Sequence, residues 1–207
     1  YLNSDISLKH SIRISGDVKL CLNGFSIISD GTVTGRHVII VEGSSLTLTD
    51  CKGSGKITHA DKKNGGGVSV YNPSSVFNMF GGIITGNNID GGVKNNGTFN
   101  MYGGEISGNH GGNGAGIETQ NGTVTMYGGT ISDNHVDAAS NYGGGGVCAH
   151  SGGRFTMYGG TISNNESTND GGGGVTVWGG GLVTIAGGTI SGNKATEDGG
   201  GIYTNGT

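Results

Sequence analysis

The chain has 207 residues, of which 32% are hydrophobic and 48 are Gly, and it carries a formal net charge of −4. This length suits one domain with a sizeable core. The acidic balance, without any run of Lys or Arg, argues against nucleic acid and anionic membrane surfaces as partners, and no apolar stretch approaches the roughly 18 residues of a membrane span.

Residues 1–60 contain short segments in which apolar and polar residues alternate. These segments are Val18-x-Leu20-x-Leu22, Val38-x-Ile40 and Leu46-x-Leu48. Alternation with a period of two indicates β-strands. The segments are less regular than those that follow, and terminal repeats of a solenoid are atypical because they must cover its end. The sequence therefore predicts two irregular opening coils.

Residues 61–207 contain three kinds of alternating segment in a constant order. The first is Gly-Gly-Gly-Val-x-Val, as at residues 65–70, and the third is Gly-Gly-Thr-Ile-Ser-x-Asn, as at residues 128–134. The second is Phe or Val, a polar residue, and Met or Ile; its copies lie 22, 25, 31 and 28 residues apart and begin at Phe77, Phe99, Val124, Phe155 and Val183. Gly pairs and Asn-Gly dipeptides between the segments indicate turns.

Three strands and three turns within about 25 residues predict one coil of a parallel β-helix. The predicted fold class is all-β: a single-stranded parallel β-helix, or β-solenoid, of about seven to eight coils with three short strands in each. Residues 61–207 form its regular repeats within one continuous domain. The sequence starts inside a strand-like pattern and stops at an Asn-Gly-Thr turn, so we expect an excerpt of a longer protein.

Stacked coils place equivalent residues in ladders along the rod. One inward ladder is expected to consist of Met79, Met101, Met126, Met157 and Ile185. A ladder at one corner is expected to consist of Asn87, Asn109, Asn134, Asn165 and Asn193. Stacked amides can satisfy their own donors and acceptors between coils, so this ladder is predicted to be structural. The aromatic row Phe80, Tyr102, Tyr127 and Tyr158 is also interpreted first as structural.

Three cysteines are present, and none has the spacing of a zinc ligand. Cys21 and Cys51 lie about one repeat apart, whereas Cys148 is alone. A Cys21–Cys51 disulfide between neighbouring coils would suit an oxidising compartment. Two free thiols fit the sequence equally well.

The blocks at residues 65–68, 77–82 and 130–134 resemble the right-handed parallel β-helix repeats of large bacterial surface proteins, which are common in gut Gram-positive bacteria. They are also similar to the repeats of polymorphic outer-membrane adhesins. The resemblance covers nearly the whole chain. It implies a right-handed β-helix in an exported protein at the bacterial cell surface, with an adhesive or recognition role toward a host glycan or host protein.

The same fold also carries polysaccharide-active enzymes, so catalytic residues need a separate search. Glycoside hydrolysis requires two carboxylates on either side of one bond, but the outward positions of the first strand offer only Lys94 and Glu118 on adjacent coils. These are expected to form a solvated ion pair. We therefore predict no catalytic residues and a non-enzymatic role. The alternatives are an enzyme whose catalytic coils lie outside this segment and a passive surface stalk.

Metal sites are not expected, with one weak exception. Asp170 and Asp198 each precede a Gly-Gly run, and stacked on adjacent coils they could share Ca²⁺, which takes several oxygen ligands. The favoured interpretation is that each Asp simply starts a turn. The six histidines show no metal spacing and are expected on solvated turns.

Coil length varies mainly between the corner Asn and the next Gly run, so these loops are predicted to form one ridge that binds a ligand. The ridge comprises residues 135–142, 166–170 and 194–198. Trp178, the only Trp, is expected to face outward beside it. It is interpreted either as a platform for a sugar or a protein hot spot, or as a residue that only covers the corner under its own loop. The predicted ligand-binding residues are Tyr71, Glu118, Gln120, Tyr142, His150, Asp170, Trp178, Asp198 and Tyr203.

Overall fold

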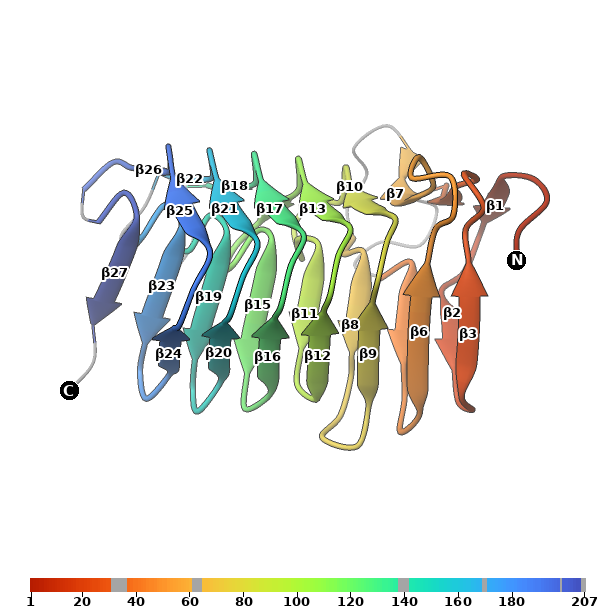
Figure 1. Cartoon of the computed structure of the whole chain (residues 1–207), viewed down its shortest axis with the longest axis horizontal. Helices are drawn as coiled ribbons and strands as arrows, with labels where there is room; N and C mark the ends of the chain where they lie inside the picture. Colours follow the sequence, from red (N-terminus) through yellow and green to blue (C-terminus); the bar gives the residue numbers. More distant parts are fainter. Residues whose placement is uncertain (31–36, 61–64, 138–141, 169–170, 198, 206–207) are drawn as a thin grey trace.

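The computed structural model describes residues 1–30, 37–60, 65–137, 142–168, 171–197 and 199–205. They form an elongated parallel β-solenoid with its two termini at opposite ends (Figure 1). This confirms the predicted fold class. The structure has about six turns, slightly fewer than the predicted seven to eight.

Among the described residues, two of the sheets contain eight strands each, and their neighbouring strands pair in parallel. Sheet A consists of β1 (Ile6–Leu8), β4 (Ile27–Ser29), β7 (Lys56–His59), β10 (Ile83–Thr85), β13 (Glu105–Ser107), β17 (Thr130–Ser132), β21 (Thr161–Ser163) and β25 (Thr189–Ser191). Sheet B consists of β2 (Ile12–Ile14), β5 (Ile39–Val41), β8 (Val68–Val70), β11 (Val93–Asn95), β15 (Ile117–Gln120), β19 (Val147–His150), β23 (Val175–Trp178) and β27 (Ile202–Asn205).

In the part of the chain that the structure describes, sheet C has seven strands, and a short fourth sheet, which we call the minor sheet, has four. Sheet C consists of β3 (Val18–Cys21), β6 (Ser45–Thr49), β9 (Val76–Met79), β12 (Thr98–Met101), β16 (Thr123–Met126), β20 (Arg154–Met157) and β24 (Leu182–Ile185). The minor sheet consists of β14 (His110–Gly111), β18 (His135–Val136), β22 (Glu166–Ser167) and β26 (Lys194–Ala195). The coils from β13 onward therefore have a fourth strand that the sequence did not predict.

The core follows the predicted inward ladders. Met79, Met101, Met126 and Met157 align on consecutive strands of sheet C, and all four are fully buried. The rings of Phe77 and Phe99 stack with centroids 4.8 Å apart. Alternation along each strand sends every second side chain inward, so one apolar column runs along the rod.

The corner asparagines form the predicted amide ladder. The side-chain Nδ2 groups of Asn87, Asn109, Asn134 and Asn165 each donate to Oδ1 of the next Asn along the rod, at 2.9–3.0 Å. The ladder starts with His59, whose Nδ1 lies 2.9 Å from Oδ1 of Asn87. His59 is buried, so the expectation of a solvated histidine is wrong here, because the ladder needs a donor at its first rung.

The Gly-Gly pair after each Met strand is required by close approach between coils. Gly129 has a φ of 87°, and a Cβ there would lie 2.7 Å from Met101 Cε and 2.8 Å from the carbonyl oxygen of Gly104. A side chain at this position would collide with both the Met ladder and the preceding coil. None of the described residues belongs to a helix long and apolar enough to cross a membrane.

Cys21 and Cys51 lie side by side as thiols, with their Sγ atoms 3.5 Å apart. Hydrogen bonds from Cys51 lower the pKa of the Cys21 thiol, and the same contact raises the pKa of Cys51. Cys21 is therefore the thiol that more readily becomes a nucleophilic thiolate.

We expect mild oxidation with oxidised glutathione to join Cys21 to Cys51 within one chain, because the sulfur atoms already touch. Intact mass should fall by two hydrogens, and the melting temperature should rise by several degrees because the bond closes a loop between coils. Cys51→Ser is the control. Intermolecular dimers without the intrachain bond would contradict this prediction.

Candidate functional site

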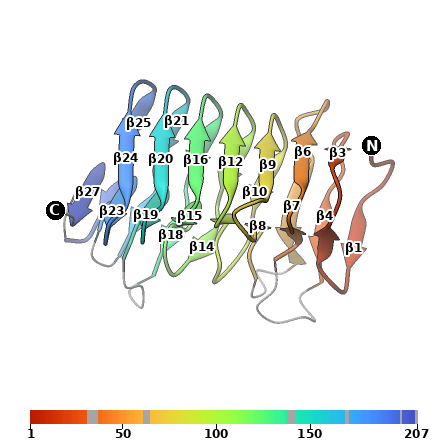
Figure 2. The same cartoon turned by 90° about the horizontal axis from the view of Figure 1, so that it is seen from below.

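Most of the predicted ligand-binding residues lie on the outer face of sheet B. Strands β15, β19, β23 and β27 run side by side toward the C-terminal end (Figure 2). Their register aligns one outward row that consists of Glu118, Cys148, Thr176 and Tyr203. A second outward row consists of Gln120, His150, Trp178 and Asn205. Neighbours in a row are one coil apart, so the predicted candidates from four coils form one surface.

A buried ionic network lies in the middle of this face. Nε2 of His150 is 2.9 Å from Oε1 of Glu118, and Nζ of Lys94 is 3.2 Å from its Oε2. The Glu118 side chain is only 10% exposed and that of Lys94 is 35% exposed. The cross-coil pair exists as predicted, but the expectation that it is solvated is wrong. His150 is likewise buried.

The environment keeps Glu118 ionised. Burial acts to raise the pKa of its carboxyl, but the hydrogen bond with His150 and the charge of Lys94 outweigh burial, so the pKa is lowered. A carboxylate bound through both oxygens is poorly suited to donate a proton. The network instead holds the ring of His150 in place.

An aromatic cluster lies over this network, and we define it as Tyr142, His150, Trp178 and Tyr203. The ring of Tyr142 lies 4.9 Å from that of His150 and 5.7 Å from that of Trp178, measured between centroids. Trp178 and Tyr203 stack at 6.1 Å. Tyr142, Trp178 and Tyr203 are half-buried, so each presents part of its ring to solvent.

Cys148 and Thr176 occupy the outward row but are fully buried. Burial and the charge of Glu118 raise the pKa of the Cys148 thiol well above its usual range, so it is an unreactive packing residue. The hydroxyl of Thr176 accepts from the backbone N–H of Gly172 at 2.7 Å. The chain segment that leads into each strand covers these two side chains. The strand pattern alone did not predict this cover.

Part of the predicted ridge is β-structure. Its first residues form the minor sheet, in which His135 contacts Asp137 and Glu166 at 3.1 and 3.4 Å. Residues 138–141, Asp170 and Asp198 lie outside the described residues, so the calcium prediction is not addressed by the structure. Within the described part of the chain, no three His, Cys, Asp or Glu side chains gather as metal ligands.

The second aromatic row is a continuous ring stack. Phe80, Tyr102, Tyr127 and Tyr158 follow one another with centroids 4.5, 4.9 and 5.6 Å apart and nearly parallel planes. Because the rings cover one another's faces, a ligand would meet mainly their edges. This geometry agrees with a structural role, since sugars stack on ring faces.

The N-terminal half of the same face of sheet B contains a pocket of about 420 Å³. It is lined by Arg13, His37, Ile40, Ser69, Tyr71, Asp90, Lys94 and Asn96. Of these, only Tyr71 was among the predicted binding residues. No repeat pattern in the sequence links Arg13, His37 and Asp90, because they come from irregular or corner positions. Only the stacking of the coils brings them together.

Comparison with known proteins finds no significant match: no family model, no curated protein and no solved structure is similar to this chain. The resemblance to bacterial surface repeats is therefore supported only in the fold, a parallel β-solenoid.

Proposed function

We propose that this β-solenoid is a non-enzymatic recognition segment of a bacterial cell-surface protein and that its aromatic cluster binds a host glycan or glycoprotein. The observation that carries the proposal is the position of Trp178. It lies between Tyr142 and Tyr203 on a face built from rigid parallel strands. Partly exposed aromatic rings with a polar edge are typical of sugar platforms and of interface hot spots.

The surroundings of Trp178 support binding of a polar ligand. Gln120 and Asn205 occupy the same outward row on other coils, so amide donors and acceptors lie along the row that contains the indole. His150 is fixed from below by Glu118 and contacts the Tyr142 ring. A preorganised site of this kind loses little side-chain entropy when it binds.

The chemistry of the site favours binding over hydrolysis. Glu118, the one buried carboxylate among the described residues, is engaged by His150 and Lys94, whereas glycoside hydrolysis uses two carboxyl groups on opposite sides of the scissile bond. Incubation with host and plant polysaccharides tests the enzymatic alternative directly. Release of shortened products would replace this proposal with an enzyme.

A screen against host glycans and glycoproteins should identify a ligand whose binding changes the fluorescence of Trp178, the only Trp in the chain. For that ligand, we expect Trp178→Ala to weaken binding by about 2 kcal/mol or more, which is roughly thirtyfold. Isothermal titration calorimetry measures the loss. The fold should survive, because Trp178 faces outward and its removal leaves no core cavity.

Tyr127→Ala is the matched control from the stacked aromatic row. It should lower the melting temperature, because Tyr127 stacks between Tyr102 and Tyr158, and leave affinity nearly unchanged. The reverse result, with affinity lost only in Tyr127→Ala, would move the site to the stacked row. A screen that finds no ligand would favour the alternative of a passive surface stalk.

A further inference from the structure

The pocket at the N-terminal half of sheet B lies on the same face as the aromatic cluster. Its floor is an outward row in which Arg13, Ile40, Ser69 and Lys94 align on consecutive strands β2, β5, β8 and β11. That row continues into Glu118 on β15. The pocket and the aromatic cluster are thus two parts of one surface, joined by the Lys94–Glu118–His150 network.

The pocket is enclosed on its sides by residues from different corners. Tyr71 and Asn96 follow strands β8 and β11 and form one wall, and His37 and Asp90 precede strands of sheet B and form the other. A volume of about 420 Å³ is within the range of small-molecule sites. Farther along the same face, the aromatic cluster lies over strands β19, β23 and β27.

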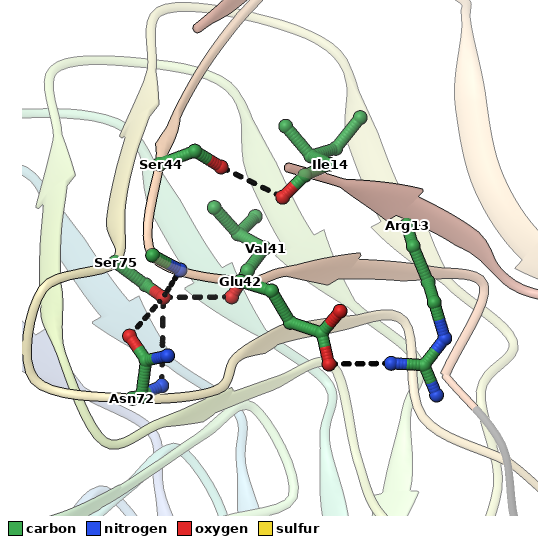
Figure 3. Close-up of polar contacts among 8 residues, drawn as sticks. Arg13, Ile14, Val41, Glu42, Ser44, Asn72 and Ser75 are labelled. Carbon is green, nitrogen blue, oxygen red and sulfur yellow. Dashed lines mark hydrogen bonds and ion pairs between the residues drawn. The ribbon is translucent and has the colours of Figure 1, made fainter. Parts of the chain in front are cut away.

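The wall that contains Tyr71 is braced. The hydroxyl of Ser75 lies 2.8 Å from both the carbonyl oxygen of Val41 and Oδ1 of Asn72, and it accepts from the backbone N–H of Gly43 at 2.9 Å (Figure 3). This cluster holds the turn that follows Tyr71, a residue that is 58% exposed. The ring therefore stands at the rim on a fixed turn, which favours stacking with a ligand.

The opposite wall depends on Gly66. A Cβ at Gly66 would lie 2.5 Å from Cδ2 of His37 and 3.0 Å from Cβ of Asp90. Only Gly leaves room for both side chains. Nε2 of His37 is buried and has no hydrogen-bond partner among the described residues. Burial lowers the pKa of His37 to about 4, so its ring is neutral at pH 7.

The charges of the pocket do not favour an anion. Arg13 is paired with Glu42 at the rim (Figure 3), and Lys94 is paired with Glu118. Asp90 has no ion pair in the part of the chain that the structure describes. With His37 neutral, the local balance is slightly negative, so an acidic sugar or phosphate would be repelled.

We propose that this pocket is a second binding site, which takes one neutral sugar unit with adjacent hydroxyl groups. The carboxylate of Asp90 accepts from two hydroxyls, Asn96 and Ser69 offer both donors and acceptors, and Tyr71 covers the apolar face of the ring. The inference deepens the proposed recognition role. It does not require that the aromatic cluster bind the same ligand.

The test is titration calorimetry of the whole chain with galactose, mannose and N-acetylglucosamine to about 10 mM, and with galacturonate as the anionic probe. At least one neutral sugar should bind, and galacturonate should bind at least tenfold more weakly. Tyr71→Ala and Asp90→Asn should each weaken the neutral sugar at least tenfold. Gly66→Ala should also weaken binding of the neutral sugar at least tenfold, because the added Cβ would push His37 and Asp90 into the pocket.

Tyr158→Ala is the matched control, because Tyr158 is 57% exposed, like Tyr71, but lies at the end of the other aromatic row. This variant should bind the neutral sugar as tightly as the unchanged protein. Melting curves identify any variant that fails to fold, and the isosteric Asp90→Asn keeps the test decisive if Gly66→Ala does fail. Absence of neutral-sugar binding, tighter binding of galacturonate, or affinity unchanged in both Tyr71→Ala and Asp90→Asn would overturn the inference. If only Trp178→Ala lost binding of the neutral sugar, the pocket would be excluded as its site and binding at the aromatic cluster would be supported.

Discussion

Replacing Met126 by Asp is expected to destabilise the solenoid by about 4 kcal/mol or more, which would unfold much of the protein at physiological temperature. Met126 is fully buried, and it lies between Met101 and Met157 on the neighbouring coils. A carboxylate at this position would have no cation and no hydrogen-bond donor inside the apolar column. Thermal and urea denaturation followed by circular dichroism measure the loss.

Thr125→Asp provides the control one residue away. Thr125 points out of sheet C between Asn100 and Thr156, where water can solvate a new charge. We expect a cost of about 1 kcal/mol or less, mainly from the poor β-propensity of Asp. Equal melting shifts in the two variants would mean that the inward register of sheet C is wrong.

Replacing Asn134 by Ala is expected to destabilise the chain by about 3–5 kcal/mol, although it removes no charge and little apolar surface. Nδ2 of Asn134 donates to the carbonyl oxygen of Ile106 and to Oδ1 of Asn165, both at 2.9 Å. Its Oδ1 accepts from the backbone N–H and the Nδ2 of Asn109 at 3.1 and 3.0 Å. All the partners left behind are buried, so water cannot replace the lost bonds.

Asn100→Ala separates this ladder effect from a general effect of removing an amide. Nδ2 of Asn100 also donates to a stacked Asn, Oδ1 of Asn78 at 2.9 Å, but on the outer face of sheet C. Solvent can satisfy the partner there, so a loss below about 1 kcal/mol is expected. Urea denaturation of both variants gives the comparison. A similar loss in both would show that the corner ladder has no special role in stability.

Both predictions concern the scaffold, and the scaffold decides how well a surface site is held. The ladders run through every regular coil, so they keep β15, β19 and β23 in register. A one-residue slip would exchange inward and outward residues along a strand. Trp178 would then enter the core and Val177 would face solvent.

The amino-acid sequence by itself determined the ladders and the register of the regular coils. The positions of the Met, Ile and Asn ladders follow from the repeat because each turn of the rod places the equivalent residue directly above the previous one. Alternation then decides which residues point outward, including Glu118, His150 and Trp178. Two-residue strands such as β14 were not predictable, since they are too short to show a period.

Only the tertiary structure decided which outward residues are covered. Glu118, His150 and Cys148 point away from the core, yet they are buried, because the segments leading into the strands of sheet B, with Tyr142 among them, pack over that face. The pocket around Arg13, His37 and Asp90 likewise exists only once separate coils are stacked. Burial of an outward position depends on loop paths and on partners from other coils, and neither leaves a periodic signal in the sequence.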